Sequence, residues 1–162
     1  MPGLGSGSRR LPALSTLLAM VAAGLIAAGP AVARVAHASS STVTVVEHAN
    51  TDTEVPVAPG GKDEKGDILT FVNPVFNAGD TKQVGHDEGF CTRLDPKKGV
   101  WECLWTTFLK GGQITVQGPF YDTKNSTLSI TGGTGAYKTA RGQMKLKSLD
   151  GGKKYDFIFE LS

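Results

Sequence analysis

The sequence predicts an all-β fold, an eight-stranded antiparallel β-barrel that follows a signal peptide. Three observations favour this fold. No segment after Ser39 keeps a helical period, and the chain consists of short runs of alternating apolar and polar residues. Gly, Pro, Asn and Asp, which favour turns, separate these runs. The length of 162 residues suits a single domain.

The pattern predicts eight strands in order along the chain. Their ranges are 43–47, 67–76, 84–94, 100–109, 113–118, 127–131, 136–149 and 154–161. Pro74 places its part of the second strand at an edge or in a bulge, because proline has no N–H to donate. The seventh run is interrupted near Gly142, and residues 58–66 form a polar loop that is either a lid or disordered.

Hairpin-type turns between these strands suit an up-and-down or mixed-connection barrel. Side chains fill the interior of an eight-stranded barrel, or the interior holds one small ligand. A β-sandwich of the same strands is the structural alternative.

The first 38 residues have the order of a secretory signal peptide. Arg9 and Arg10 form a positive start, and residues 11–29 are apolar, uncharged and rich in Ala and Leu. The alternative is an uncleaved membrane anchor, because the apolar run is about long enough to span a bilayer. The small residues that follow, in the A-x-A pattern of a processing site, favour cleavage.

Two cleavage points fit the pattern, after Ala33 or after Ala38. The serines that follow Ala38 make a flexible start and favour the second point. The sequence therefore predicts a signal peptide at 1–38 and a β-barrel domain at 39–162. We expect a protein secreted to the extracellular space, with no stable membrane insertion after cleavage.

The charge of the chain gives no case for a nucleic acid partner. Three of its 17 Lys and Arg residues lie in the leader, which leaves 14 against 15 Asp and Glu, a net charge of −1. A near-neutral domain lacks the basic surface that nucleic acid requires. The leader residues concerned are Arg9, Arg10 and Arg34.

Cys91 and Cys103 are the two cysteines, and a turn-type segment at 94–99 separates them. A hairpin centred on Lys97 places them opposite each other, at a Cα separation of about 4.5 or 5.5 Å, which a disulfide accepts. An exported protein meets an oxidising environment, so we expect the bond to form. Two cysteines are too few ligands for a structural zinc ion, and no metal site is predicted.

Trp101 and Trp105 share the strand parity of Cys103, so all three side chains face the same side of their strand. Aromatic side chains on one face either line a cavity or pack in a subunit contact. We take both tryptophans as candidate ligand-binding residues.

The amino-acid sequence of residues 114–142 is typical of a known family. ITVQGPFYD followed by LSITGGTGAYKTARG resembles the allene oxide cyclases, and GGTGAYKTARG resembles the dirigent proteins equally well. GDILTFVN at 66–73 and GFC at 89–91 are similar to further cyclase segments in the same order, over roughly 46–161. The resemblance implies a small antiparallel barrel and a homotrimer.

In that family a pocket glutamate near the first strand drives the closure of a fatty-acid epoxide to a cyclopentenone. The resemblance assigns its place to Glu47, as the catalytic residue, that of a pocket-wall proline to Pro56, and that of a water-holding asparagine to Asn73. Ala49 and Val55 stand where the family has an asparagine and a serine. The alternatives are a solvated charge for Glu47 and a turn or bulge role for Asn73.

Three functions of different classes follow. The first is a cofactor-free isomerase or cyclase acting on a hydrophobic small molecule in the barrel cavity. The second is a dirigent-like protein that controls the stereochemistry of intermediates made elsewhere. The third is a lipocalin-like binding barrel without catalysis. The chain has no G-x-S-x-G, H-E-x-x-H, P-loop or dinucleotide motif, which disfavours hydrolase and nucleotide chemistry.

Overall fold

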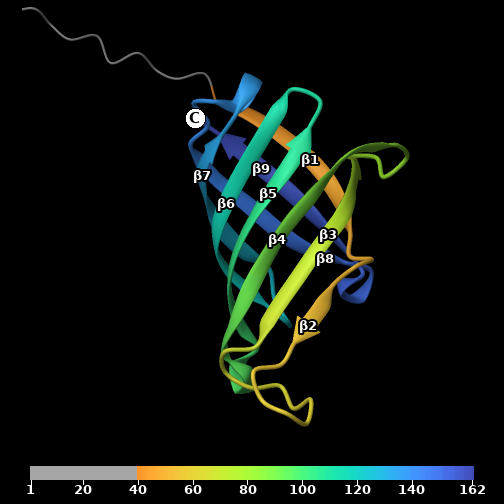
Figure 1. Ribbon diagram of the computed structural model, residues 1–162. Helices are drawn as coiled ribbons and strands as arrows, with labels where there is room; N and C mark the ends of the chain where they lie inside the picture. Colours follow the sequence, from red (N-terminus) through yellow and green to blue (C-terminus); the bar gives the residue numbers. More distant parts are fainter. Residues whose placement is uncertain (1–39) are drawn as a thin grey trace, which may run out of the picture. The chain divides into compact units, whose positions relative to one another are not determined.

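The computed structural model describes residues 40–162, and the strands of this part form a closed antiparallel β-barrel (Figure 1). The strands are β1 (Ser41–His48), β2 (Thr53–Val55), β3 (Ile68–Asn77), β4 (Gln83–Asp95), β5 (Val100–Leu109), β6 (Gly112–Tyr121), β7 (Ser126–Gly133), β8 (Gly142–Leu149) and β9 (Lys154–Leu161). The predicted signal peptide at 1–38 lies outside the described residues.

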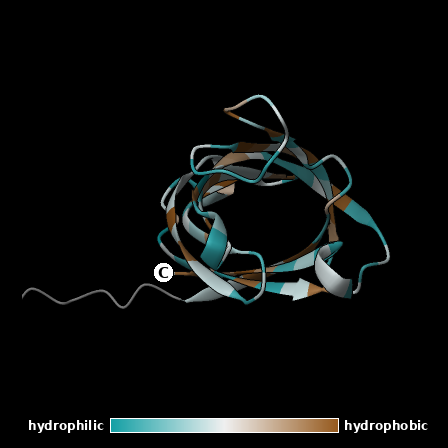
Figure 2. Cartoon of the chain, turned by 90° about the horizontal axis from the view of Figure 1, so that it is seen from below, coloured by the Kyte–Doolittle hydropathy of each residue, from teal (hydrophilic) through white to brown (hydrophobic). Residues whose placement is uncertain are grey.

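The first strand closes the barrel. β1 pairs with β9 on one side and with β3 on the other, and Val45 lies opposite both Phe157 and Asn77. From β3 to β9, each strand pairs with the next strand in the sequence. Together with β1 these make the eight-stranded ring that Figure 2 shows from below. The predicted barrel is confirmed, and the sandwich alternative is wrong because it requires open sheet edges.

The short β2 is an addition to the predicted set. It pairs with Ile68–Thr70 at the start of β3, on the side that β1 occupies further along. Between these two blocks neither β1 nor β2 pairs with β3, and Pro74 lies in that gap. A register shift against β4 follows between Val75 and Phe76. The expected edge or bulge at Pro74 is therefore confirmed.

The seventh predicted strand starts later than expected, at Gly142. Residues Gly135–Tyr137 form a 3-10 turn in which Ala136 N donates to the carbonyl of Gly111. Gly135 has a φ of 59°, and a Cβ there would lie 2.4 Å from the Gly111 oxygen. The backbones approach too closely for a side chain at this position, so the glycine-rich segment forms a turn between β7 and β8 instead of a strand.

The core alternates along each strand as a half-buried sheet requires. The largest fully buried side chains gather around β6 to β9: Ile114, Val116, Leu128, Met144, Phe157 and Phe159. Cys91 and Cys103 also point inward and form the predicted disulfide, with a Cα separation of 4.0 Å. Among residues 40–162, no helix has the length and apolar character needed to cross a bilayer.

Candidate functional site

A cavity enters the barrel from the end that carries β2. Its lining combines two acids with a mainly aromatic wall: Glu47, Asp52, Leu69, Phe71, Cys91, Cys103, Trp105, Phe120, Leu146, Tyr155 and Phe157. Leu69 pairs with Glu54 of β2, which places the cavity at that end. The cavity volume is about 30 Å³, enough for one or two water molecules.

Aromatic pairs form the rim and the floor of this cavity. Phe120 and Tyr155 are half-buried at the rim, and their rings meet edge to face with centroids 5.7 Å apart. Trp105 and Phe157 are buried at the floor, with centroids 5.4 Å apart. Phe71 packs edge-on against Trp105 at 6.1 Å. The cavity is therefore walled by ring faces and edges on several sides.

Glycine in β4 makes room for these rings. Gly89 lies between Phe71 of β3 and Trp105 of β5 in the strand register. A Cβ at Gly89 would lie 2.3 Å from the Trp105 Cβ and 2.5 Å from the Leu104 oxygen. The two aromatic side chains consequently approach the bare β4 backbone from both sides.

Glu47 is the acid that enters the apolar part of the cavity. Alternation in β1 turns Val45 and Glu47 inward, and only 6% of Glu47 is exposed. Asn73 Nδ2 donates to Glu47 Oε1 at 2.7 Å and to Asp52 Oδ1 at 2.7 Å. One amide group thus holds two carboxylates at the site.

The same asparagine fixes the segment between β1 and β2. Its Oδ1 accepts hydrogen bonds from Asn50 N at 3.0 Å, from Thr51 N at 2.9 Å and from the Thr51 hydroxyl at 3.1 Å. Asn73 is fully buried, so all its hydrogen-bonding groups serve the protein. Its function in this structure is to position Glu47 and Asp52.

A third acid, Asp87, lies behind Glu47. It is fully buried on β4, opposite Asn73 on β3 and Thr107 on β5. Among the described residues, neither Asp87 oxygen has a hydrogen-bond donor, and the buried Thr107 hydroxyl is also unpartnered. A hydrogen bond between Asp87 and Glu47 therefore exists only while one of the two acids holds a proton.

Burial and mutual repulsion set the protonation of this acid pair. Burial raises the pKa of Glu47 to about 7, against the opposing hydrogen bond from Asn73, and the charge of Asp52 raises it further. Burial, followed by the charge of Glu47, raises the pKa of Asp87 to about 9. At neutral pH the pair holds a proton, mainly on Asp87, and Glu47 exchanges its own proton readily.

Tyr155 contributes a phenol ring to the cavity that Glu47 and Asp52 line. It lies opposite Glu47 in the register of β1 and β9 and lines the cavity. Burial, followed by the charges of Glu47 and Asp52, raises the pKa of Tyr155 to about 12. The phenol stays protonated at neutral pH and is available as a hydrogen-bond donor.

The structure brings only some of the predicted site residues together. Glu47 and Trp105 line the cavity, and Asn73 lies directly behind Glu47. Trp101 is buried outside the lining, where its Nε1 donates to Asp122 at 2.8 Å. Pro56 is exposed after β2, at the surface rather than in the cavity wall.

Sequence reasoning missed Asp52, Asp87 and Tyr155. The alternation of the strands indicated two of them, because Asp87 is on the same face of its strand as Cys91 and Tyr155 is on the same face of the last strand as Phe157. Asp52 lies in the irregular segment before β2, where no periodicity gives a side-chain direction.

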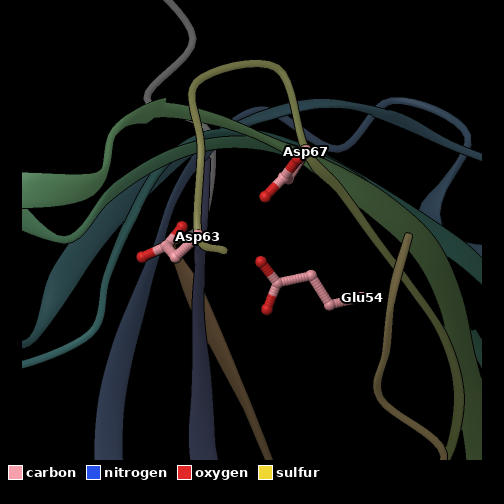
Figure 3. Close-up of side chains that lie close together, drawn as sticks. All are labelled: Glu54, Asp63 and Asp67. Carbon is pink, nitrogen blue, oxygen red and sulfur yellow. The ribbon is translucent and has the colours of Figure 1, made fainter. Parts of the chain in front are cut away.

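A second acid group lies outside the cavity, near the polar loop at 58–66. Figure 3 shows Glu54, Asp63 and Asp67 close together. Asp67 accepts from Val57 N and Glu64 N, both at 2.8 Å, which lowers its pKa. These contacts tie the ends of the loop to the barrel.

Arg93 adds further contacts that hold the polar loop to the barrel. Its Nε lies 2.8 Å from Asp63 Oδ1 and its Nη1 lies 2.6 Å from Asp122 Oδ2, while the guanidinium stacks on Trp101 at 3.9 Å. The expected alternatives for the polar loop were a lid and a disordered segment. In this structure the loop is anchored.

Comparison with known proteins identifies the family. The allene oxide cyclase family profile matches residues 37–162. The chain belongs to the allene oxide cyclase family. The match spans the complete barrel, so the resemblance predicted from sequence segments is confirmed.

Solved structures of similar fold carry different activities. A pyocyanin demethylase is 27% identical, with a TM-score of 0.63 over 75% of this chain and 100% of that chain. A pterocarpan synthase dirigent protein is 20% identical, with a TM-score of 0.62 over 76% of this chain and 85% of that one. An exo-specific intermolecular Diels-Alderase is 13% identical, with a TM-score of 0.60 over 76% and 98%. The last two show the barrel alone.

This allene oxide cyclase family member departs from the family pattern beside its glutamate. Ala49 offers no polar side chain, and Val55 is exposed on β2. The amide of Asn73 is occupied by Glu47 and Asp52. In this structure the Asn73 amide therefore bonds to protein groups, and the water-holding role that the family resemblance implies for it stays a prediction.

Proposed function

We propose that this barrel is a cofactor-free isomerase or cyclase that acts on a hydrophobic small molecule held in the cavity. The supporting observation is the Glu47 carboxylate, which is buried at an apolar, aromatic wall. In such a site a fixed charge acts on a developing charge far more strongly than in water. A surface glutamate would have no comparable effect.

In this proposal Glu47, Tyr155 and the aromatic residues each have a separate role, which we assign from their places in the cavity. Ionised Glu47 stabilises positive charge that develops on the substrate, and it removes a proton where the reaction requires a base. The Tyr155 hydroxyl donates to the oxygen or nitrogen that gains negative charge. The aromatic rim and floor hold the molecule in one orientation, which lowers the entropic cost of ring closure.

A second candidate function is demethylation of an aromatic compound. The supporting observations are the aromatic lining and the 27% identity with a pyocyanin demethylase whose whole chain is covered. The shared requirement of the two candidates is a flat substrate beside Glu47. They differ in product. An isomerase conserves the mass of its substrate, whereas demethylation consumes water, releases the methyl carbon as formaldehyde and leaves its two electrons on the aromatic ring of the substrate.

The deciding experiment starts from protein purified from its own host. Native mass spectrometry identifies a co-purifying molecule, which is then incubated with fresh wild-type protein and with a Glu47→Gln variant. A product of equal mass supports the isomerase, and loss of a methyl group supports the demethylase. Glu88→Gln, at an exposed acid on the same barrel, is the matched control.

An unchanged ligand, together with identical metabolite profiles for wild-type and Glu47→Gln, would overturn the catalytic proposal. The dirigent-like and binding alternatives predict that outcome. A dirigent-like protein would still change the stereochemistry of a coupled reaction, whereas a binding barrel would not.

Export and a homotrimer belong to the same proposal. The leader pattern and the disulfide support export, and the N-terminal residue of protein recovered from the medium tests it. Exposed apolar residues on the outer face of β3, β4 and β5 support a subunit contact: Val72, Phe90 and Leu104. Phe90 and Leu104 are direct cross-strand neighbours, so Leu104→Lys should shift sedimentation toward monomer.

A further inference from the structure

The acids of the cavity have no balancing cation in the described part of the chain. Glu47 and Asp52 line the cavity, and none of the lining residues is Lys, Arg or His. Asp87 adds a third carboxyl group behind Glu47. Among residues 40–162, the side chains that donate to these two carboxylates are neutral: the amide of Asn73 contacts both, and protonated Asp87 contacts Glu47.

Cations on the neighbouring strands are already paired with other acids. Arg93, on the inward face of β4, binds two acids that lie outside the cavity lining. His48 follows Glu47 and Lys154 precedes Tyr155, but both bind Asp80, each at 2.6 Å. The charge of the cavity is consequently left for a ligand to balance.

Two further observations point to a positively charged ligand. The cavity wall presents the rings of Phe71, Trp105 and Phe157, whose faces attract cations. Asp87 is fully buried behind Glu47 with no donor to either oxygen among the described residues, so it keeps the proton of the pair and Glu47 carries the negative charge. A cation beside Glu47 stabilises this ionised form, which burial alone disfavours.

We propose that the cavity binds an organic cation with a flat aromatic body, its positive group against Glu47. This inference rests on the proposed function and names the substrate class of the same site. The cavity volume of about 30 Å³ suits a small charged group such as an N-methyl iminium. The aromatic body then lies at the rim beside Phe120 and Tyr155.

Binding of such a cation is coupled to release of a proton. Four titratable groups face the bound charge: Glu47, Asp52, Asp87 and Tyr155. Burial raises the pKa of Glu47 to about 7, so below that pH the cation must displace a proton. Its affinity therefore increases with pH by about tenfold per unit until Glu47 is ionised.

The test compares two molecules of the same shape. N-methylquinolinium carries a permanent charge, and the matching methylnaphthalene is its neutral isostere. Both are titrated into the wild-type protein by calorimetry from about pH 5 to about pH 8, in buffers of different ionisation enthalpy that report proton release. The same titrations are made with Glu47→Gln and with the control Glu88→Gln.

We expect the cation to bind at least about tenfold more tightly than its isostere at about pH 8. Glu47→Gln should remove this preference, and Glu88→Gln should retain it. Equal or tighter binding of the neutral molecule would overturn the proposal, and so would a preference that survives in Glu47→Gln. Absence of binding by both molecules at millimolar concentration would also count against it.

Failure of this inference is distinguishable from failure of the proposed function. A barrel that prefers the neutral isostere can still convert a neutral substrate in a Glu47-dependent reaction. If Glu47→Gln has an altered fold by circular dichroism, Asp52→Asn gives an independent test, because it removes the other acid of the cavity lining and should weaken binding of the cation but not of the neutral molecule.

Discussion

Asn73 lies directly opposite Asp87 across β3 and β4, yet its amide donates to Glu47 and Asp52 and leaves Asp87 without a donor. The asparagine thereby distinguishes between three acids. Its hydrogen bond favours the charged form of Glu47, whereas burial without such a donor raises the pKa of Asp87.

The first prediction concerns stability against pH. The folded pKa values of Glu47 and Asp87 are raised to about 7 and about 9. The folded state therefore binds more protons than the unfolded state between about pH 4 and pH 9, and stability falls as pH rises. Where an acid is protonated in the folded state and ionised in the unfolded state, the free energy of unfolding falls by about 1.4 kcal/mol per pH unit.

Asp87→Asn should flatten this dependence and stabilise the protein at about pH 9, because the amide carries no charge to bury. Urea unfolding at several pH values measures the effect. Glu88→Gln, which removes an exposed acid from the same strand, should keep the wild-type slope. If the stability of Asp87→Asn depends on pH as steeply as that of the wild-type protein, Asp87 is ionised in the folded protein.

A second prediction concerns the pH profile of any reaction that uses Glu47 as base or anion. Burial raises the pKa of this carboxyl to about 7, so the rate should increase with pH through that value and then level off. Glu47→Gln should lower turnover by about two orders of magnitude or more. A rate that falls over the same range would assign the active form to the protonated acid.

The third prediction separates positioning from ordinary packing. Asn73→Ala removes the donor to two acids and the acceptor of Asn50 and Thr51. We expect a loss of about 3 kcal/mol or more in the free energy of unfolding. Hydrogen exchange at the Asn50 and Thr51 amides should accelerate.

Asn77→Ala is the matched control for this change. Asn77 lies on the same strand, and within residues 40–162 its side chain bonds only to Thr81 and Lys82 in the following turn. Its loss should leave exchange in the segment between β1 and β2 unchanged. Equal acceleration in both variants would indicate general destabilisation.

A fourth prediction uses two glycines. Gly89→Ala places a methyl group against Trp105 and the Leu104 carbonyl, and should cost about 1–3 kcal/mol while narrowing the cavity. Gly132→Ala meets no atom within 4 Å and should change stability by about 0.5 kcal/mol or less. Thermal unfolding and Trp fluorescence measure both variants, and similar values would argue against crowding at Gly89.

The strands could be predicted because period-two patterns and turn residues specify them locally. The opposition of Cys91 and Cys103 followed from the length of their hairpin, and the structure has that register. The start of the seventh strand was misplaced because Gly135 meets the Gly111 backbone, a contact between distant segments. Local patterns contain no information on such a contact.

The candidate site was only partly predictable for the same reason. Glu47 was assigned through family resemblance, and its burial depends on ring closure between β1, β3 and β9. Asp87 lies in a polar run, G-H-D-E-G, that is typical of a solvated strand. Asp52 reaches the cavity because Asn73 holds its backbone segment, and no sequence pattern indicates that arrangement.

The bond between Cys91 and Cys103 has a consequence for ligand traffic. The disulfide forms part of the cavity wall and covalently links β4 to β5 at the level of the cavity. Separation of these two strands is thus closed as an entry route for the proposed ligand, whose route in our proposal is the cavity rim beside Phe120 and Tyr155. Reorientation of such half-buried rings is much faster than strand opening, so exchange should proceed without local unfolding.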